Sequence, residues 1–196
     1  MNTKTTVVIG LLILVLGVGL SLSSRDSGAN PTWVHEVNWH DKPDNAEKIE
    51  ALLWDEINPY RTEYEVVNIS ASSEGERVRL KVIAVTKDAG YPDIYDFVYD
   101  GEGLLLTGYL LEAIPQAYSN EVIGIALSNQ EVAASVTGVP TVRRILPGTS
   151  EKFYAPKTLL SVTWDGVSAL VDLEDGKVVQ VWRAGAEGAV ANVNVH

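Results

Sequence analysis

The stretch Arg77-Val-Arg-Leu-Lys-Val-Ile-Ala-Val-Thr86 decides what kind of fold this chain adopts. Its apolar positions from Val78 to Ala84 fall on every second residue, and Arg77, Arg79 and Lys81 fall between them. Alternation with a period of two is typical of a strand that buries one face and leaves the other largely solvated. A second strand-like run at 64–70 precedes the turn Glu74-Gly75-Glu76, so the two runs predict a β-hairpin.

Similar runs on both sides of this hairpin extend it into longer meanders. Further strands are predicted at 33–39, 94–99, 104–111, 141–146, 158–164, 167–173 and 177–182. Asp165-Gly166 and Asp175-Gly176 separate three of them, and Asp-Gly supports the positive φ angles of a type I′ turn. Both dipeptides are therefore predicted to form tight hairpin turns.

Helical periodicity interrupts the strands in two places. Residues 46–57 carry an apolar stripe that includes Ile49 and Leu53, with Asp44 or Asn45 as the expected N-cap. A second helix is predicted at 119–127, and Asn129 or a neighbouring residue caps a short helix that ends near Gly138. Each predicted helix is followed by several strands.

A helix followed by a meander, twice over, predicts an α+β fold with antiparallel sheets, each buried on one face under its helix. Because the loop lengths differ between the halves, the repeat concerns the order of helices and strands and not the individual residues. The expected segments are a signal anchor or transmembrane helix at 1–24, a linker at 25–32, an α+β N-terminal unit at 33–114, a second α+β unit at 115–183 and a Gly/Ala-rich tail at 184–196.

The N-terminus is expected to reach a membrane. Residues 5–24, between Lys4 and Arg25, are uncharged and apolar all round, and twenty helical residues span about 30 Å, the thickness of a bilayer's hydrocarbon core. Lys4 favours a cytoplasmic N-terminus, which makes the chain a single-pass membrane protein with its globular part extracytoplasmic. A cleaved signal ending near residues 21–23 would make the chain secreted instead, and a pilin-type cut after Gly10 is a third reading.

The charge balance limits the partners of the globular part. Beyond Arg25 lie all twenty-six acidic residues and only thirteen basic ones, in a chain of net charge −11. Such a surface repels nucleic acid and anionic lipid headgroups, so no nucleic-acid partner is expected. The chain has no cysteine, which excludes disulfides and thiolate chemistry. Asn68-Ile-Ser70 matches a glycosylation sequon.

The histidines do not form a metal site by their spacing. His35 and His40 lie five residues apart, whereas a zincin places two histidines four apart on one helical face. On a strand, five residues place the two side chains on opposite faces. His196 could join them only through a tertiary contact.

The remaining charged clusters have ordinary structural explanations. We expect the carboxylates of Asp93, Asp96, Asp100 and Glu102 to be solvated strand ends, with calcium binding as the alternative. Arg143-Arg144, the basic pair of an acidic domain, is expected on a strand surface. Without a nucleophile–base pattern, phosphate loop or dinucleotide motif, the sequence predicts no catalytic, cofactor-binding or metal-ligating residue, and no cofactor.

The second half resembles PepSY-like domains at about residues 117–183. The residues that carry the resemblance are the helical run Glu121-Val-Ile-Gly-Ile-Ala-Leu127 with Asn129-Gln-Glu-Val132, and the hairpin Val171-Asp-Leu-Glu-Asp-Gly-Lys-Val-Val179. Asp175 stands where threonine is usual in that family. The resemblance implies a small extracytoplasmic α+β module without catalytic residues, which binds or restrains a partner protein.

Two functions follow from these observations. The first is a membrane-anchored, non-enzymatic module that binds or regulates another envelope protein. The second is a structural or accessory subunit of a surface or membrane assembly, in which the alternating terminal segments at 33–39 and 191–196 add to a neighbour's sheet edge. An enzyme, with or without a metal, is a third and less supported reading.

Overall fold

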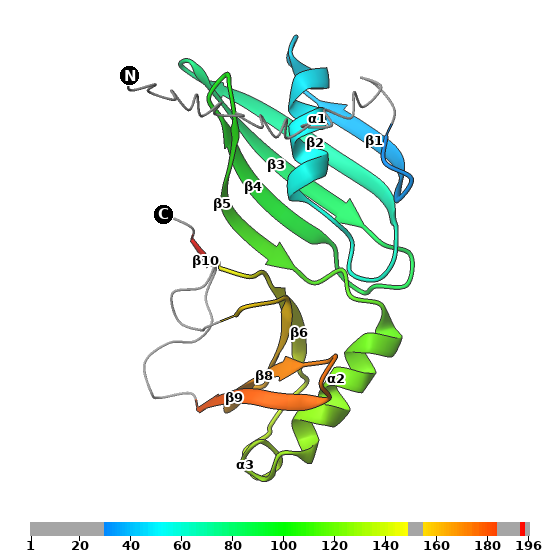
Figure 1. The fold of residues 1–196 in the computed structure, drawn as a ribbon, viewed down its shortest axis with the longest axis vertical. Coiled ribbons are helices and arrows are strands. Elements are labelled where there is room, and N and C mark those ends of the chain that lie inside the picture. Colours follow the sequence, from blue (N-terminus) through cyan, green and yellow to red (C-terminus); the bar gives the residue numbers. More distant parts are fainter. Residues whose placement is uncertain (1–29, 149–154, 184–192, 195–196) are drawn as a thin grey trace, which may run out of the picture.

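The computed structural model describes residues 30–148, 155–183 and 193–194 of the chain (Figure 1). Within these residues the chain forms ten strands and three helices. In chain order they are β1 (Val34–His40), α1 (Ala46–Glu56), β2 (Tyr64–Glu74), β3 (Arg77–Val85), β4 (Asp93–Tyr99), β5 (Leu104–Leu111), α2 (Gln116–Ser128), α3 (Gln130–Ala133), β6 (Thr141–Ile145), β7 (Leu159–Thr163), β8 (Val167–Asp172), β9 (Lys177–Arg183) and β10 (Val193–Asn194).

The strands form two separate sheets, which Figure 1 shows one above the other along the long axis of the molecule. The first has the order β1-β2-β3-β4-β5-β10, and the second has the order β6-β7-β8-β9. Neighbouring strands are antiparallel throughout except at β1, which runs parallel to β2. Helix α1 connects these two parallel strands, as a crossover between parallel strands requires.

The first sheet packs one face against α1. The stripe of Ile49 and Leu53 on this helix is fully buried, together with Val82 on β3 and Phe97 on β4. The helix ends at Glu56, after which Ile57 is extended and also buried. The alternation that predicted β3 therefore points its apolar residues at α1 and its charged residues at the opposite face.

The second sheet is buried on both faces in its central strands. Leu160 and Val171 pack with Val122 of α2 on one side. Leu159 and Leu170 pack with Ile145, Ala155 and the half-buried Trp182 on the other side. Among the described residues the first sheet differs, because Ser72, Arg79 and Lys81 on its face opposite α1 are exposed.

The expected α+β fold class is wrong. Of the described residues, 44% lie in strands and 19% in helices, so the molecule is mostly β. The expected fold class assumed that each helix forms a complete layer over its sheet. The helices α1, α2 and α3 are short, with 11, 13 and 4 residues, whereas the described chain forms ten strands. The first sheet also departs from a pure antiparallel meander, because β1 joins it in parallel.

None of the helices among the described residues is long and apolar enough to cross a membrane. The expected anchor at 1–24 lies outside the described residues, and so does most of the tail at 184–196. The tail contributes β10, which pairs with Tyr109 and Gly108 of β5.

The expected hairpins at Asp165-Gly166 and Asp175-Gly176 do connect β7 to β8 and β8 to β9. Neither is a type I′ turn, since of these four residues only Gly176 has a positive φ angle, at 62°. Asn129 caps α3 as predicted, and its side chain accepts hydrogen bonds from the backbone N–H groups of Glu131 and Val132. Asn45 precedes α1, but its side chain makes no capping hydrogen bond.

Candidate functional site

A buried ion pair joins the two sheets. Arg144 on β6 donates from Nη2 to Oδ2 of Asp93 on β4 at 2.8 Å. The side chains are only 3% and 1% exposed, respectively. Arg144 also donates from Nη1 to the backbone carbonyl of Asn58 at 2.8 Å. Strand β6 of the second sheet is therefore fixed to the end of the first sheet by charged groups removed from water.

Two tyrosines and a backbone amide also belong to this network, in which the buried Nε of Arg144 makes no hydrogen bond to any residue that the structure describes. The Tyr64 hydroxyl donates to Oδ2 of Asp93 at 2.7 Å, and the backbone N–H of Ala113 donates to Oδ1 at 2.8 Å. The Tyr95 hydroxyl accepts from Nη2 of Arg144 at 2.8 Å and lies 3.1 Å from that of Tyr64. Both carboxylate oxygens are thus hydrogen-bonded, which is the condition under which a buried charge is tolerated.

The electrostatics of the network reflect its burial. Burial raises the pKa of the Asp93 carboxyl above its ordinary value, and the neighbouring Arg144 opposes that rise. Burial also raises the pKa of Tyr95 to about 12. Shifted groups of this kind occur at active sites and in structural ion-pair networks alike. Because the carboxylate and the guanidinium are almost fully covered by protein, the network is closed to a substrate and acts as a structural joint.

Further contacts surround the joint at the surface. Arg143 of β6 donates from Nε to Glu112 at 2.7 Å. Arg61, in the loop between α1 and β2, has a φ angle of 54° and lies over the rings of Tyr60 and Tyr118, with its guanidinium carbon 5.6 and 5.3 Å from their centroids. Tyr60 itself packs on the core of the second sheet. These contacts hold the α1–β2 loop against α2.

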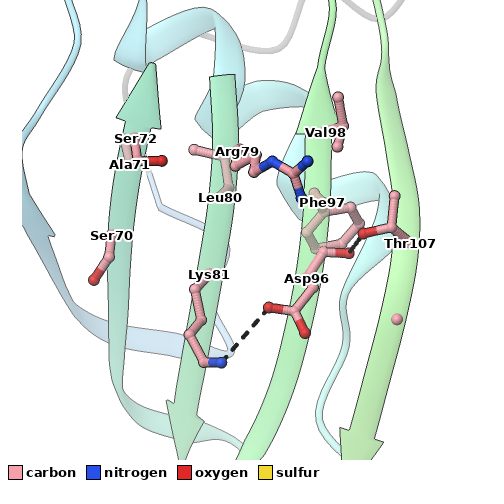
Figure 2. Close-up of a pocket in the computed structure, with 11 residues that line it drawn as sticks. Ser70, Ala71, Ser72, Arg79, Leu80, Lys81, Asp96, Phe97, Val98 and Thr107 are labelled. Atoms are coloured by element: carbon pink, nitrogen blue, oxygen red, sulfur yellow. Dashed lines mark hydrogen bonds and ion pairs between the residues drawn. The ribbon is translucent and has the colours of Figure 1, made fainter. Parts of the chain in front are cut away.

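The accessible candidate site lies on the face of the first sheet opposite α1. Figure 2 shows side chains from β2, β3, β4 and β5 on this face. They surround a hollow of about 380 Å³. Small residues line it on both outer strands: Ser70 and Ser72 on β2 pair with Lys81 and Arg79, and Gly108 on β5 pairs with Asp96.

A β-bulge shapes one wall of the hollow. The register between β4 and β5 shifts between Asp96 and Phe97, so that Thr107 is the extra residue on β5. Its hydroxyl donates to the backbone carbonyl of Asp96 at 3.1 Å (Figure 2). Bulges bend and twist a strand locally and redirect side chains, and they recur near binding sites.

Two cations line the hollow. The Lys81 ammonium lies 3.7 Å from the Asp96 carboxylate, and Arg79 pairs with Glu74 at the end of β2. In Figure 2 the Arg79 side chain extends across the face towards Val98 on β4. The hollow thus offers one guanidinium group, one ammonium group, two serine hydroxyls and an apolar side. Its lining residues carry charged, hydroxyl and apolar groups, which are groups that can contact a bound partner.

His35 and His40 have separate partners in the structure. His35 contacts Glu63 at 2.8 Å, while His40 lies 3.3 Å from its neighbour Asp41. Among the described residues no group of three histidine, aspartate or glutamate side chains is placed to hold a metal ion. His196 lies outside the described residues.

The four expected strand-end carboxylates separate into different environments. Asp100 accepts hydrogen bonds from the backbone N–H groups of Glu102 and Gly103 in the β4–β5 turn, as a turn residue does. Asp96 faces the hollow. Asp93 contradicts the expectation, because it is buried in the joint rather than solvated.

Arg144 was likewise expected on a strand surface, and it is buried. Arg143 keeps 30% exposure of its side chain and comes closer to that expectation. The sequence gives only a weak signal that Asp93 and Arg144 are buried. Each is followed by an isoleucine, Ile94 and Ile145 respectively, as is common in any strand. Only the fold brings Asp93 and Arg144, 51 residues apart, into contact.

No family model, no curated protein and no solved structure matches this chain. The likeness of residues 117–183 to PepSY-like domains therefore stays a prediction.

Proposed function

We propose that the protein is a membrane-anchored, extracytoplasmic, non-enzymatic module that binds or regulates another envelope protein through the open face of its first sheet. The observation that carries the proposal is the hollow on this face, lined by Ser70, Ser72, Arg79, Lys81 and Asp96. A concave surface that combines charged, hydroxyl and apolar side chains is suited to recognition.

The contrast between the two sheets supports this choice of surface. Central strands of the second sheet bury both faces, with Leu160 and Leu170 in separate apolar clusters. In the first sheet α1 covers one face, whereas Ser72, Arg79 and Lys81 on the other are exposed. A face rich in exposed polar groups and built on rigid strands can present the same geometry to each partner.

The N-terminal segment and the PepSY-like resemblance support the location and the class. The uncharged run at 5–24 has the length of a membrane-spanning helix, and modules of the PepSY type are associated with partner proteins in the cell envelope. In this proposal the tether holds the module at the membrane, where its partner lies.

Site-specific photocrosslinking in native membranes tests the proposal. A photoreactive amino acid replaces Val98 at the rim of the hollow, and in a control it replaces Glu121, which is exposed on α2. We expect one defined partner protein to be captured from position 98 and not from position 121. Capture of this chain alone, or equal capture from both positions, contradicts the proposal.

A structural subunit is the second candidate, and the edge position of β1 favours it. Strand β1 lies at one edge of the first sheet, and β10 from the tail lies at the other, each paired with its own chain. A neighbour's strand can add to an edge such as that of β1. Deleting residues 191–196 and measuring assembly mass by native mass spectrometry tests donation of the tail, and an unchanged mass counts against it.

A further inference from the structure

We infer that the hollow on the first sheet binds an acidic segment of the partner in extended conformation, whose carboxylates at alternate residues pair with Arg79 and Lys81. The inference rests on the proposed function, since it specifies the chemistry of the partner at the same surface.

Three cations of this acidic chain lie in a row on one strand face. The structure describes twelve of the fifteen lysines and arginines, and Arg77, Arg79 and Lys81 project in sequence from the exposed face of β3. The chain as a whole carries a net charge of −11. An anionic polymer that spreads over the molecule is repelled by that charge, whereas a short acidic segment can contact the cationic strand alone.

The spacing of these cations matches an extended peptide. Residues two apart on a strand are separated by about 6.6–6.8 Å, and the same repeat separates alternate side chains of any extended chain. A peptide lying along β3 therefore presents residues i and i+2 to Arg79 and Lys81, and turns the residue between them to solvent. Carboxylates at i and i+2 fit this register, and carboxylates at adjacent residues do not.

Both cations remain available to a partner. Their side chains are 64% and 55% exposed even with Glu74 and Asp96 beside them. Exposed ion pairs of this kind contribute little to stability, so an incoming carboxylate can join or replace the internal one at small cost. The Arg79 guanidinium has further N–H donors for a second acceptor.

The neighbouring side chains add selectivity. Ser72 and Ser70 lie beside Arg79 and Lys81 on β2 and offer hydroxyl donors to the same carboxylates. On the other side Val98 pairs with Leu105, which is 62% exposed. An acidic segment with an apolar residue on its β5 side therefore fits better than a purely acidic one.

Fluorescence anisotropy with the full-length chain in a non-ionic detergent tests the inference. The probes are three labelled ten-residue peptides of equal composition except for acid placement: three glutamates at alternate positions, three at adjacent positions, or three glutamines. Arg79→Glu/Lys81→Glu is compared with Lys42→Glu/Lys87→Glu, which makes the same charge change at exposed loop residues. Circular dichroism checks that both variants are folded.

We expect the alternating peptide to bind most tightly, and Arg79→Glu/Lys81→Glu to weaken it at least about tenfold while the loop variant changes it about twofold or less. Equal binding of the alternating, adjacent and glutamine peptides, or no binding of any, overturns the inference. Equal competition by a ten-nucleotide oligo-dT also overturns it, in favour of general anion binding. Crosslinking from position 98 tests the proposed function separately. If it captures a partner while the peptides show no preference, the acidic segment is refuted and the proposed docking face is retained.

Discussion

At the scale of single residues, the ion pairs of the molecule lie in two different environments, exposed and buried. Exposed pairs such as Arg79 with Glu74 keep most of their contact with water and contribute little to stability. The Arg144–Asp93 pair has lost that contact, and removing either partner leaves the other charge buried without compensation. Ion pairs of the same chemical type are therefore exposed on the open face and buried in the joint.

Replacing Arg144 by methionine is expected to lower the free energy of unfolding by about 3–5 kcal/mol, because the Asp93 carboxylate remains buried without its cation. Asp93→Asn combined with Arg144→Met is expected to cost less than the two single changes added together, by about 0.5–3 kcal/mol. Guanidinium denaturation of the full chain in detergent, followed by tryptophan fluorescence, measures each value.

Arg183→Met is the matched control, since Arg183 pairs with Glu131 at the surface with 60% of its side chain exposed. Its expected effect is within about 1 kcal/mol. If the costs of Asp93→Asn and Arg144→Met add without coupling, the two residues are not energetically linked and the joint is not an ion pair in solution.

At the scale of elements, the strands and helices were predictable because their signals are local. The alternation at 77–86 and the stripe of Ile49 and Leu53 depend only on neighbouring residues, and β3 and α1 lie close to the expected bounds. The parallel pairing of β1 was missed, although the order strand, helix, strand at 33–70 is itself the signal of a parallel crossover. The joint could not be predicted, because its partners Asp93 and Arg144 meet only through the arrangement of both sheets.

Two glycines provide an element-scale prediction. Gly138, between α3 and β6, has a φ angle of 77°, and a Cβ there would lie 2.7 Å from Oδ2 of Asp165. Gly124 lies exposed within α2, and a Cβ there would meet nothing within 4 Å. Gly138→Ala is expected to destabilise the chain by about 1–2 kcal/mol, since left-handed backbone disfavours a side chain. Gly124→Ala is expected to stabilise it by up to about 1 kcal/mol, since alanine favours a helix.

Thermal unfolding of the two variants, monitored by circular dichroism, measures these opposite effects. The comparison holds the chemical change constant and varies only the backbone conformation and the surrounding space. Equal shifts in the midpoint temperature would mean that the turn at Gly138 is not left-handed in solution.

At the scale of the whole molecule, the joint and the open face form one arrangement. Arg144, Tyr64 and Tyr95 fix the second sheet to the end of the first, and the hollow lies on a face that neither α1 nor the second sheet covers. The sheet that carries the hollow is thereby fixed to the second sheet. In the proposed function, the N-terminal segment adds the remaining requirement, which is a position at the membrane beside the partner.

The proposed tether leads to a prediction about the whole chain. Leu12→Arg/Leu16→Arg places two cations within the uncharged run at 5–24, and each charge near the centre of a spanning helix costs about 2.5–3.5 kcal/mol of insertion free energy. We expect this variant to be lost from the membrane fraction after alkaline carbonate washing, while Leu12→Val/Leu16→Val is retained. Because the open face is unchanged, the purified arginine variant is expected to bind the alternating-glutamate peptide with unchanged affinity and yet to fail to capture the partner from position 98 in cells. Retention of the arginine variant in washed membranes contradicts the tether, and full partner capture by a variant absent from the membrane shows that tethering is not part of the function.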